Sequence, residues 1–209
     1  MQIAFVLYDR FTALDIIGPF NVLAYVPGVE ARFVAETRDP VTADVGRPVI
    51  VPDLTFDECP SPDIVVVPGG PGAARIAEIT ALTDWLRRVH PTTTYTTSVC
   101  TGAFALAGAG LLDGLRATTH WSSLERLADY GALPVAERVV DEGRIVTGAG
   151  VSAGIDMALT LVGRHWGDVV AQTVQLGIEY DPQPPYDAGS PATAPAEVVA
   201  YLRDGAALG

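Results

Sequence analysis

The segment TYTTSVCTGAFALAGAGLL, residues 94–112, joins two different patterns through one cysteine. Residues 94–99 are rich in β-branched and aromatic side chains, which favour a strand. Residues 101–112 form a helical run of small apolar residues that ends at an Asp-Gly pair. A strand that passes directly into a helix through a tight turn is a nucleophile elbow, which lifts the side chain at the turn, here Cys100, out of the sheet.

Elsewhere in the chain, apolar runs of strand length alternate with helical segments. The predicted strands are residues 3–8, 31–37, 63–70 and 94–99 with a hairpin over 137–150, and the predicted helices are residues 14–26, 81–90, 101–112, 122–131, 152–166 and 167–180. This alternation favours a central, mainly parallel sheet with helices on both faces. We therefore expect a flavodoxin-like three-layer α/β sandwich, in which ligands bind beyond the carboxyl ends of the strands.

The chain of 209 residues suits one domain, and we expect a single domain over residues 1–209 because neither an internal repeat nor a linker is evident. The tail from Asp181 is rich in proline, glycine and alanine. It is expected either to pack as an extended arm before a short final helix or to be mobile. Within residues 14–26, the Gly18-Pro19 pair predicts that the regular helix begins near the proline, with Asp15 just before it.

Charge and composition disfavour two classes of partner. The net charge is −12, from 13 basic and 25 acidic residues, so neither nucleic acid nor an anionic membrane is an expected partner. No apolar run approaches the roughly 20 residues that span a bilayer. The opening MQIAFVLYDR has no basic leader and resembles a first strand, so we expect a cytoplasmic protein.

The cysteines are Cys59 and Cys100. A reducing compartment disfavours a disulfide between them, and the sequence has no CxxC motif or Cys/His cluster that predicts zinc. We expect no metal and no cofactor. Cys59 precedes a proline in a loop and has no elbow, so we expect no chemical role for it.

Two interpretations of Cys100 remain open from its local pattern. At an elbow, backbone N–H groups and the positive end of the following helix lower a thiol pKa, and the thiolate is the reactive form. Alternatively, Cys100 is an inert buried thiol, which is common in proteins.

The Gly69-Gly70 turn at the end of segment 63–70 also has two interpretations. It either presents N–H groups to an anion or is simply a tight turn.

Asp15 and His120 are the candidate partners of the cysteine. Asp15 lies between Leu14 and Ile16, and carboxylates are rarely buried without a reason. It is either an acid/base group in an apolar pocket or a helix N-cap. His120 follows the cysteine by twenty residues near the end of a short strand, where it either reaches the same rim or has a structural role.

Four segments resemble the ThiJ/PfpI superfamily over nearly the whole chain. They are LYDRFTALDIIGPFNVL (7–23), VVVPGGPG (65–72), TSVCTGAFALAGAGLLDGLRATTHW (97–121) and VTGAGVSAGIDMALTLV (146–162). Within the superfamily, the chain is most similar to the isonitrile hydratases, on the LD..GP motif around Asp15, on Thr101 after the cysteine and on the proline-rich tail. The elbow and the ATTHW motif are less specific, since they also resemble the amidotransferase-like domain of AraC-type regulators.

This resemblance implies a homodimer with Cys100 as nucleophile and Asp15 and Thr101 as its catalytic partners. It also implies that the backbone around Gly70 and Thr101 stands near the sulfur and that the turn at Ala149, Gly150 and Val151 lines the site. His120 and Trp121 are further expected substrate-binding residues, from their position after the cysteine. Protease-like members carry histidine where Thr101 stands, and glyoxalase- or deglycase-like members carry glutamate where Asp15 stands. Both departures disfavour those activities, and because no helix-turn-helix segment is found up to residue 209, a DNA-binding regulator is not expected.

The expected reaction is hydration of an isonitrile to an N-substituted formamide through a thioimidate on Cys100, with Asp15 as general acid/base. Thr101 is expected to hold the carboxylate or the water, and Trp121, Phe20 and Val151 to line an apolar pocket. The alternatives are another cysteine enzyme of the superfamily, of glyoxalase or amidase type, or a redox sensor without catalytic activity.

Overall fold

The computed structural model describes residues 1–203. Contacts within the chain divide it into two compact units, Met1–Ile178 and Glu179–Gly209. The expectation of one domain over residues 1–209 stays a prediction.

The first unit is organised around a seven-stranded sheet with the order β10-β11-β7-β6-β1-β2-β5. All neighbouring strands are parallel except β10 and β11, which form the predicted hairpin. The strands are β1 (Gln2–Val6), β2 (Glu30–Ala35), β5 (Leu54–Thr55), β6 (Ile64–Val67), β7 (Tyr95–Val99), β10 (Val139–Glu142) and β11 (Ile145–Gly148). The mainly parallel sheet predicted from the alternating pattern is therefore confirmed.

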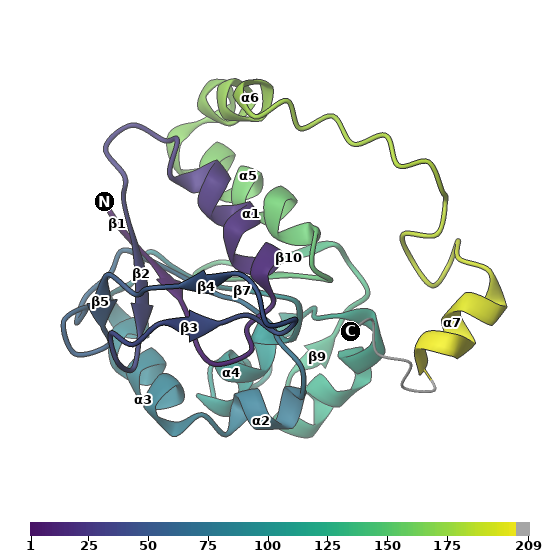
Figure 1. Ribbon diagram of the computed structural model, residues 1–209, viewed down its shortest axis with the longest axis horizontal. Coiled ribbons are helices and arrows are strands. Elements are labelled where there is room, and N and C mark those ends of the chain that lie inside the picture. The colour runs from purple at the N-terminus through teal and green to yellow at the C-terminus, as the bar shows by residue number, and fades with distance from the viewer. Residues whose placement is uncertain (204–209) are drawn as a thin grey trace. The chain divides into compact units, whose positions relative to one another are not determined.

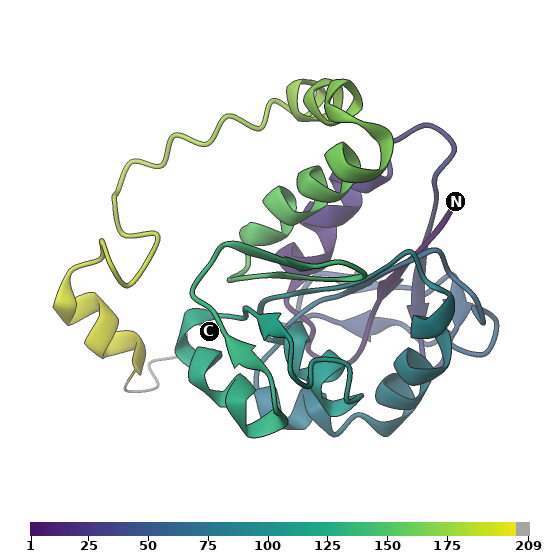
Figure 2. The ribbon, with the colours of Figure 1, turned by 180° about the vertical axis from the view of Figure 1, so that it is seen from behind.

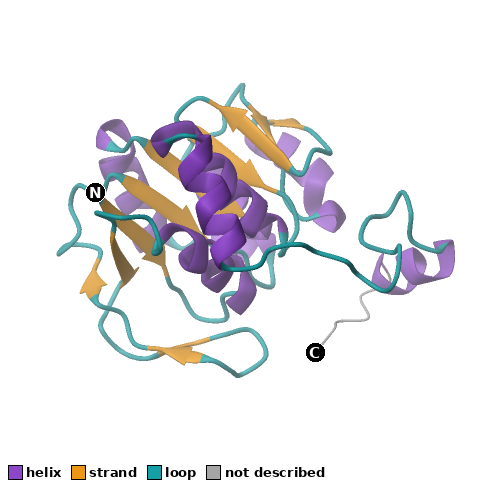
Figure 3. Cartoon of the chain, turned by 90° about the horizontal axis from the view of Figure 1, so that it is seen from above, coloured by secondary structure: helices purple, strands orange, loops and turns teal. Residues whose placement is uncertain are grey.

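Helices cover both faces of this sheet (Figures 1 and 2). One face carries α1 (Ala13–Leu23) and α5 (Ala153–Trp166), which lie side by side across the strands in Figure 3, and α5 continues into α6 (Asp168–Gly177). The other face carries α2 (Ala73–Ala77), α3 (Thr80–Val89) and α4 (Ala103–Gly108). This is the expected three-layer sandwich, because each apolar strand needs cover on two sides.

The start of α1 differs from the prediction. The helix begins at Ala13 after Thr12 as N-cap, so Asp15 lies in its first turn and Pro19 lies inside it. A proline inside a helix removes one backbone hydrogen bond. Here Pro19 is buried against α5, with its Cγ 3.0 Å from the point where a Gly154 Cβ would stand, and this packing offsets the lost bond. Asp15 is consequently not the N-cap.

Several short elements were not predicted. They are the antiparallel hairpin of β3 (Val41–Thr42) and β4 (Val49–Ile50), the pair β8 (Arg116–Ala117) and β9 (Leu133–Pro134), strand β5, helix α2 and the 3₁₀ turn η1 (His90–Thr92). Two residues are too few to display a period, so pattern cannot reveal such strands. The predicted helix over 122–131 is present as η3 (Trp121–Tyr130), but with 3₁₀ geometry.

The elbow follows a fully buried strand. All five residues of β7 are buried, and η2 (Cys100–Gly102) leads from it directly into α4. A Cβ at Gly102 would clash with the Val67 carbonyl oxygen and lie 2.6 Å from that of Pro68. The small residues after the cysteine are therefore needed because the helix start packs directly on the turn after β6.

The second unit has no helix or strand from 179 to 195 and ends, within the described residues, in α7 (Ala196–Arg203). No residue of α7 is buried. The predicted short final helix is confirmed. Across residues 1–203, no helix is both long enough and apolar enough to cross a membrane.

Candidate active site

Cys100 occupies the elbow as the sequence predicts. Its φ angle is +56°, in the left-handed region that side chains other than glycine rarely adopt, so the turn is strained at this residue. Its N–H donates to the Ala149 carbonyl oxygen at 2.7 Å, which connects the elbow to the turn after β11. The side chain is buried, with 6% of the residue exposed.

Asp15 lies in the first turn of α1, and its carboxylate faces the Cys100 thiol. The carboxylate is fully buried, and its Oδ2 accepts a hydrogen bond from the Gly69 N–H at 2.8 Å. Its Oδ1 is buried and accepts no hydrogen bond from residues 1–203. One oxygen is thus fixed by the backbone, and the other is available to take up or release a proton.

Thr101 and Gly70 bind each other reciprocally. The Thr101 hydroxyl donates to the Gly70 carbonyl oxygen at 2.7 Å and accepts from the Gly70 N–H at 2.9 Å. This hydroxyl therefore clamps the β6 turn to the elbow. The Gly70 N–H is engaged by Thr101, so a contact between Gly70 and substrate stays a prediction.

Gly69 leaves no space for a side chain at the centre of this arrangement. A Cβ there would lie 2.6 Å from the Thr101 backbone nitrogen, 2.7 Å from the Thr101 hydroxyl and 2.8 Å from Asp15 Oδ2. Real Cβ atoms do not approach other atoms so closely. The Thr101 hydroxyl and the Asp15 carboxylate can therefore lie this close together only because Gly69 has no side chain.

Burial raises the pKa of Asp15 from its ordinary value of 3.8 to about 7. Hydrogen bonds from the Gly69 N–H and the Cys100 thiol lower the pKa, and the charge of Asp44 raises it, but burial dominates. The carboxyl group therefore titrates close to neutral pH, where an acid/base group is most effective.

The pKa of Cys100 moves opposite to the sequence prediction. Burial, reinforced by the charge of Asp15, raises it above the ordinary thiol value. The N–H groups of Thr101 and Val151 and the Thr101 hydroxyl do lower the pKa as an elbow should, but their effect is smaller. The thiol therefore keeps its proton in the free protein, and attack by sulfur requires a base.

The turn 149–151 and His120 form the neighbouring rim. Thr119, beside His120, donates from its hydroxyl to the Cys100 carbonyl oxygen at 2.7 Å. A Cβ at Gly150 would lie 3.2 Å from His120 Cδ2, so the imidazole packs against this turn. Burial lowers the pKa of His120, and its Nδ1 lies 2.8 Å from Ser122 Oγ. His120 therefore reaches the predicted rim as a neutral ring.

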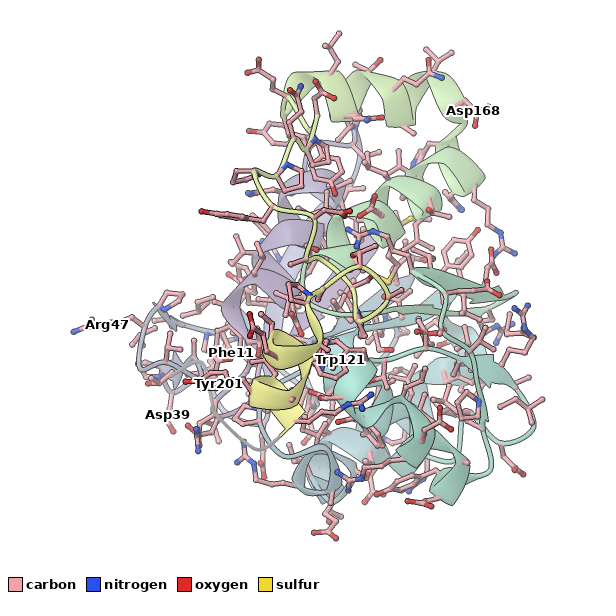
Figure 4. All side chains as sticks on the ribbon, turned by 90° about the vertical axis from the view of Figure 1, so that its right-hand side faces the viewer. Phe11, Asp39, Arg47, Trp121, Asp168 and Tyr201 are labelled. Atoms are coloured by element: carbon pink, nitrogen blue, oxygen red, sulfur yellow. The ribbon has the colours of Figure 1, made fainter. Side chains whose placement is uncertain are left out.

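Trp121, labelled in Figure 4, is the first residue of η3 and is half-buried. Its ring centroid lies 5.6 Å from that of His120, which places it next to the rim. Its role as a wall of the substrate pocket stays a prediction, as does that of Phe20, whose ring stacks on Phe33 with centroids 5.0 Å apart.

Sequence reasoning missed two residues near the site. Tyr8 follows β1, is buried, and donates from its hydroxyl to the Pro68 carbonyl oxygen at 2.8 Å. Burial raises its pKa, and the charges of Asp15 and Cys100 add to this effect. Asp44 lies on the β3–β4 hairpin. Asp44 was missed because the strands of its hairpin are too short to show a period. Tyr8 was missed because a tyrosine next to an apolar strand resembles an ordinary core residue.

Cys59 has none of these partners. It is fully buried in a loop, with Sγ 3.6 Å from Gln2 Oε1, and burial alone raises its pKa to about 11. Within residues 1–203, no three His, Cys, Asp or Glu side chains lie close enough together to hold a metal ion.

The fold and site together define an α/β protein with a cysteine elbow and a buried acid at the carboxyl ends of its central strands. Residues 1–164 match the DJ-1/PfpI family, and the chain belongs to this family.

Two curated relatives and one solved structure are informative. The chain is 45% identical to "Isonitrile hydratase" of Pseudomonas putida, an alignment that covers 99% of this chain and 90% of the relative. It is 33% identical to the HTH-type transcriptional regulator GbdR of Pseudomonas aeruginosa, covering 86% of this chain but only 51% of the regulator. A crystal structure of a ThiJ/PfpI family protein from Pseudomonas syringae superimposes with a TM-score of 0.92 at 39% identity, covering 97% of this chain and 84% of that one.

Proposed function

We propose that this chain is an isonitrile hydratase, an enzyme that adds water to an isonitrile to give an N-substituted formamide. The observation that carries the proposal is a buried thiol beside a buried carboxyl group whose pKa lies near 7. The near-full-length similarity to a relative of that name supports it. The conversion needs a nucleophile and one proton-transfer group, and this site has one of each.

The first step joins the substrate to the sulfur. In the ionised form, Asp15 takes the Cys100 proton as Sγ attacks the terminal carbon of the isonitrile. Asp15 then delivers this proton to the same carbon. A C–S bond and a C–H bond form while one carbon–nitrogen π bond is lost, which leaves a neutral thioimidate, R–N=CH–S–Cys100. The proposal assigns this proton to Asp15 Oδ1, which is buried and accepts no hydrogen bond within residues 1–203.

The second step releases the product. Asp15 takes a proton from water as the water oxygen attacks the thioimidate carbon, and it passes this proton to the imine nitrogen. As the tetrahedral adduct collapses, Asp15 takes the remaining hydroxyl proton, the C–S bond breaks and R–NH–CHO forms. The departing thiolate recovers a proton from Asp15, so enzyme and acid return to their starting states. Thr101 and Val151 contribute N–H groups that stabilise the sulfur anion as it leaves.

Other residues of the site have supporting roles in this proposal. Thr101 holds the β6 turn through Gly70, and Gly69 directs the Asp15 carboxylate. The substrate-contacting residues are taken to be Gly70, Ala149, Gly150, Val151, His120 and Trp121. The scheme uses no metal and no cofactor.

We further propose that the protein is a cytoplasmic homodimer. The exposed large apolar side chains of the first unit include Leu14, Tyr25, Val169 and Leu176, and Leu176 is 81% exposed. Exposed apolar surface of this kind favours association. Light scattering during size exclusion tests the dimer, and a monomer at micromolar concentration would contradict it.

The function is tested by incubating the protein with cyclohexyl isonitrile and measuring N-cyclohexylformamide by chromatography. Parallel incubations with methylglyoxal and with small amides test a glyoxalase or amidase, and peroxide labelling of Cys100 tests a redox sensor. Turnover of the isonitrile alone is the expected result. Turnover of another substrate, or oxidation without any turnover, would replace the proposal.

A further inference from the structure

A second carboxylate lies close to the start of α1. Asp44 is half-buried between β3 and β4. Its Oδ2 accepts a hydrogen bond from the Thr12 hydroxyl at 2.6 Å, and its backbone N–H donates to the Phe11 carbonyl oxygen at 2.9 Å. Asp44 is therefore bound to the segment before α1 by both its side chain and its backbone.

The base of the hairpin is seated on the same segment. Arg10 donates its N–H to the Thr42 carbonyl oxygen at 2.9 Å, and Phe11 forms a parallel bridge with Ala43. Residues 45–49 beyond this base are exposed, and Figure 4 shows the Arg47 side chain pointing outwards. The base of the hairpin, which includes Asp44, is therefore the part that contacts the segment before α1.

Thr12 connects Asp44 to the proposed acid. As the N-cap of α1, Thr12 accepts a hydrogen bond from the Asp15 N–H at 3.1 Å through its carbonyl oxygen. Its own N–H donates to the Gly69 carbonyl oxygen at 2.8 Å. Gly69 in turn donates a hydrogen bond to the Asp15 carboxylate. Thr12 therefore contacts Asp15 directly, through the Asp15 N–H, and indirectly, through Gly69. Asp44 holds Thr12 by its hydroxyl.

We propose that Asp44 is a positioning residue of this site, which holds Thr12 at the start of α1 and places a carboxylate beside the segment that carries Asp15. The proposal deepens the proposed function and rests on it for the role of Asp15. Asp44 acts through Thr12 and through its charge and has no contact with the reacting atoms.

The charged groups around Asp15 support this role. Cys100 faces it from the elbow and Tyr8 from the end of β1, while the charge of Asp44 raises the pKa of both Asp15 and Tyr8. Arg75, on α2, lowers the pKa of Tyr8.

Helix α5, which packs on α1, contributes Asp156, but this carboxylate pairs with Arg138. The charge of Asp44 is therefore an influence on the Asp15 carboxyl group from outside the elbow that a single substitution can remove.

Asp44→Asn removes the charge and keeps the Thr12 bond through its amide oxygen, while the bond that Oδ1 accepts from the exposed Val45 N–H is lost. Carboxyl groups are followed by ¹³C NMR on aspartate-labelled protein, with the Asp15 signal assigned by its loss in Asp15→Asn. The titration midpoint of Asp15 is expected to fall by roughly half to one pH unit. The low-pH limb of kcat/KM should move with it, raising kcat/KM at pH 6 by roughly three- to fivefold at an unchanged plateau.

Asp57→Asn is the matched control, because Asp57 is an exposed carboxylate (93% for its side chain) on the loop after β5. It should leave the Asp15 midpoint in place. Thr12→Val should lower kcat, and Thr12→Ser should restore it, because serine keeps the hydroxyl bound by Asp44.

An unchanged Asp15 midpoint in folded Asp44→Asn, or an equal shift in Asp57→Asn, overturns the role of Asp44. The NMR titration needs no substrate. If the wild-type protein fails to hydrate isonitriles, the proposed function falls, while the titration still decides whether Asp44 acts on Asp15.

Discussion

Cys59 and Cys100 are both buried thiols in the first unit, with exposed fractions of 0% and 6%. Burial raises the pKa of each. They differ in their surroundings, since Cys59 lies near a glutamine amide oxygen, whereas Cys100 faces a carboxylate and two backbone N–H groups. Burial alone therefore makes a thiol inert, and a reactive thiol needs a proton acceptor and anion-stabilising donors within reach.

Removing each sulfur in turn is the strongest test of this comparison. Cys100→Ala should lower kcat/KM for cyclohexyl isonitrile at least about 10⁴-fold, because no other group forms the covalent intermediate. Cys59→Ala should keep activity within about twofold and lose only packing energy, about 1 kcal/mol of unfolding free energy. Formamide production that survives Cys100→Ala would abolish the distinction between the two thiols.

Asp15→Asn removes the proton acceptor that Cys59 lacks. Loss of general acid/base catalysis should lower kcat/KM about 10²–10⁴-fold, while the amide oxygen still accepts from Gly69. The measurement is formamide production across pH 5–9. Wild-type rates should rise with pH through about 7 as Asp15 ionises. Full activity in the variant would leave Cys100 as nucleophile but exclude Asp15 as its base.

The same substitution should stabilise the protein at high pH. The pKa of Asp15 is raised on folding from 3.8 to about 7, so the folded state favours the protonated form and loses stability as the pH rises through this window. Relative to wild type, the unfolding free energy of Asp15→Asn should grow by roughly 4 kcal/mol between pH 4 and pH 9. Urea unfolding at both pH values measures it, and a pH-independent difference would contradict a buried titrating acid.

Thr101→Val gives the smallest effect and separates clamping from stability. It removes both hydrogen bonds with Gly70, which should cost about 1–3 kcal/mol of unfolding free energy and lower kcat about tenfold. Thr97→Val is the matched control, since the Thr97 hydroxyl donates to the Val65 carbonyl oxygen inside the sheet. It should cost similar stability with activity kept within about twofold. Equal losses of activity would mean that Thr101 has no specific role.

The hydrophobic pattern of the sequence predicted those helices and strands that were long enough to show a period. The four parallel strands β1, β2, β6 and β7 and the hairpin of β10 and β11 fall where the apolar runs place them. The two-residue strands β3 and β4 were missed because the place of their hairpin depends on backbone bonds to residues 10 and 11, which have no local signature. Asp44 was missed with them.

Pro19 shows a different limit. A proline read locally predicts a helix start, yet here α1 continues through it from Ala13. The reason lies in α5, whose Gly154 gives the Pro19 ring room to pack. Packing between helices far apart in sequence overrides a local preference when it buries enough surface.

The sequence by itself determined the sandwich, the elbow at Cys100 and the candidate pairing with Asp15, because periodicity and motif residues are local properties of the chain. Only the tertiary structure decided the protonation of that pair. Burial shifts both pKa values upward, and burial is the sum of atoms brought in by β1, β6, β7 and α1. An elbow read in isolation favours a thiolate, whereas burial in the folded protein favours the protonated forms of both Cys100 and Asp15.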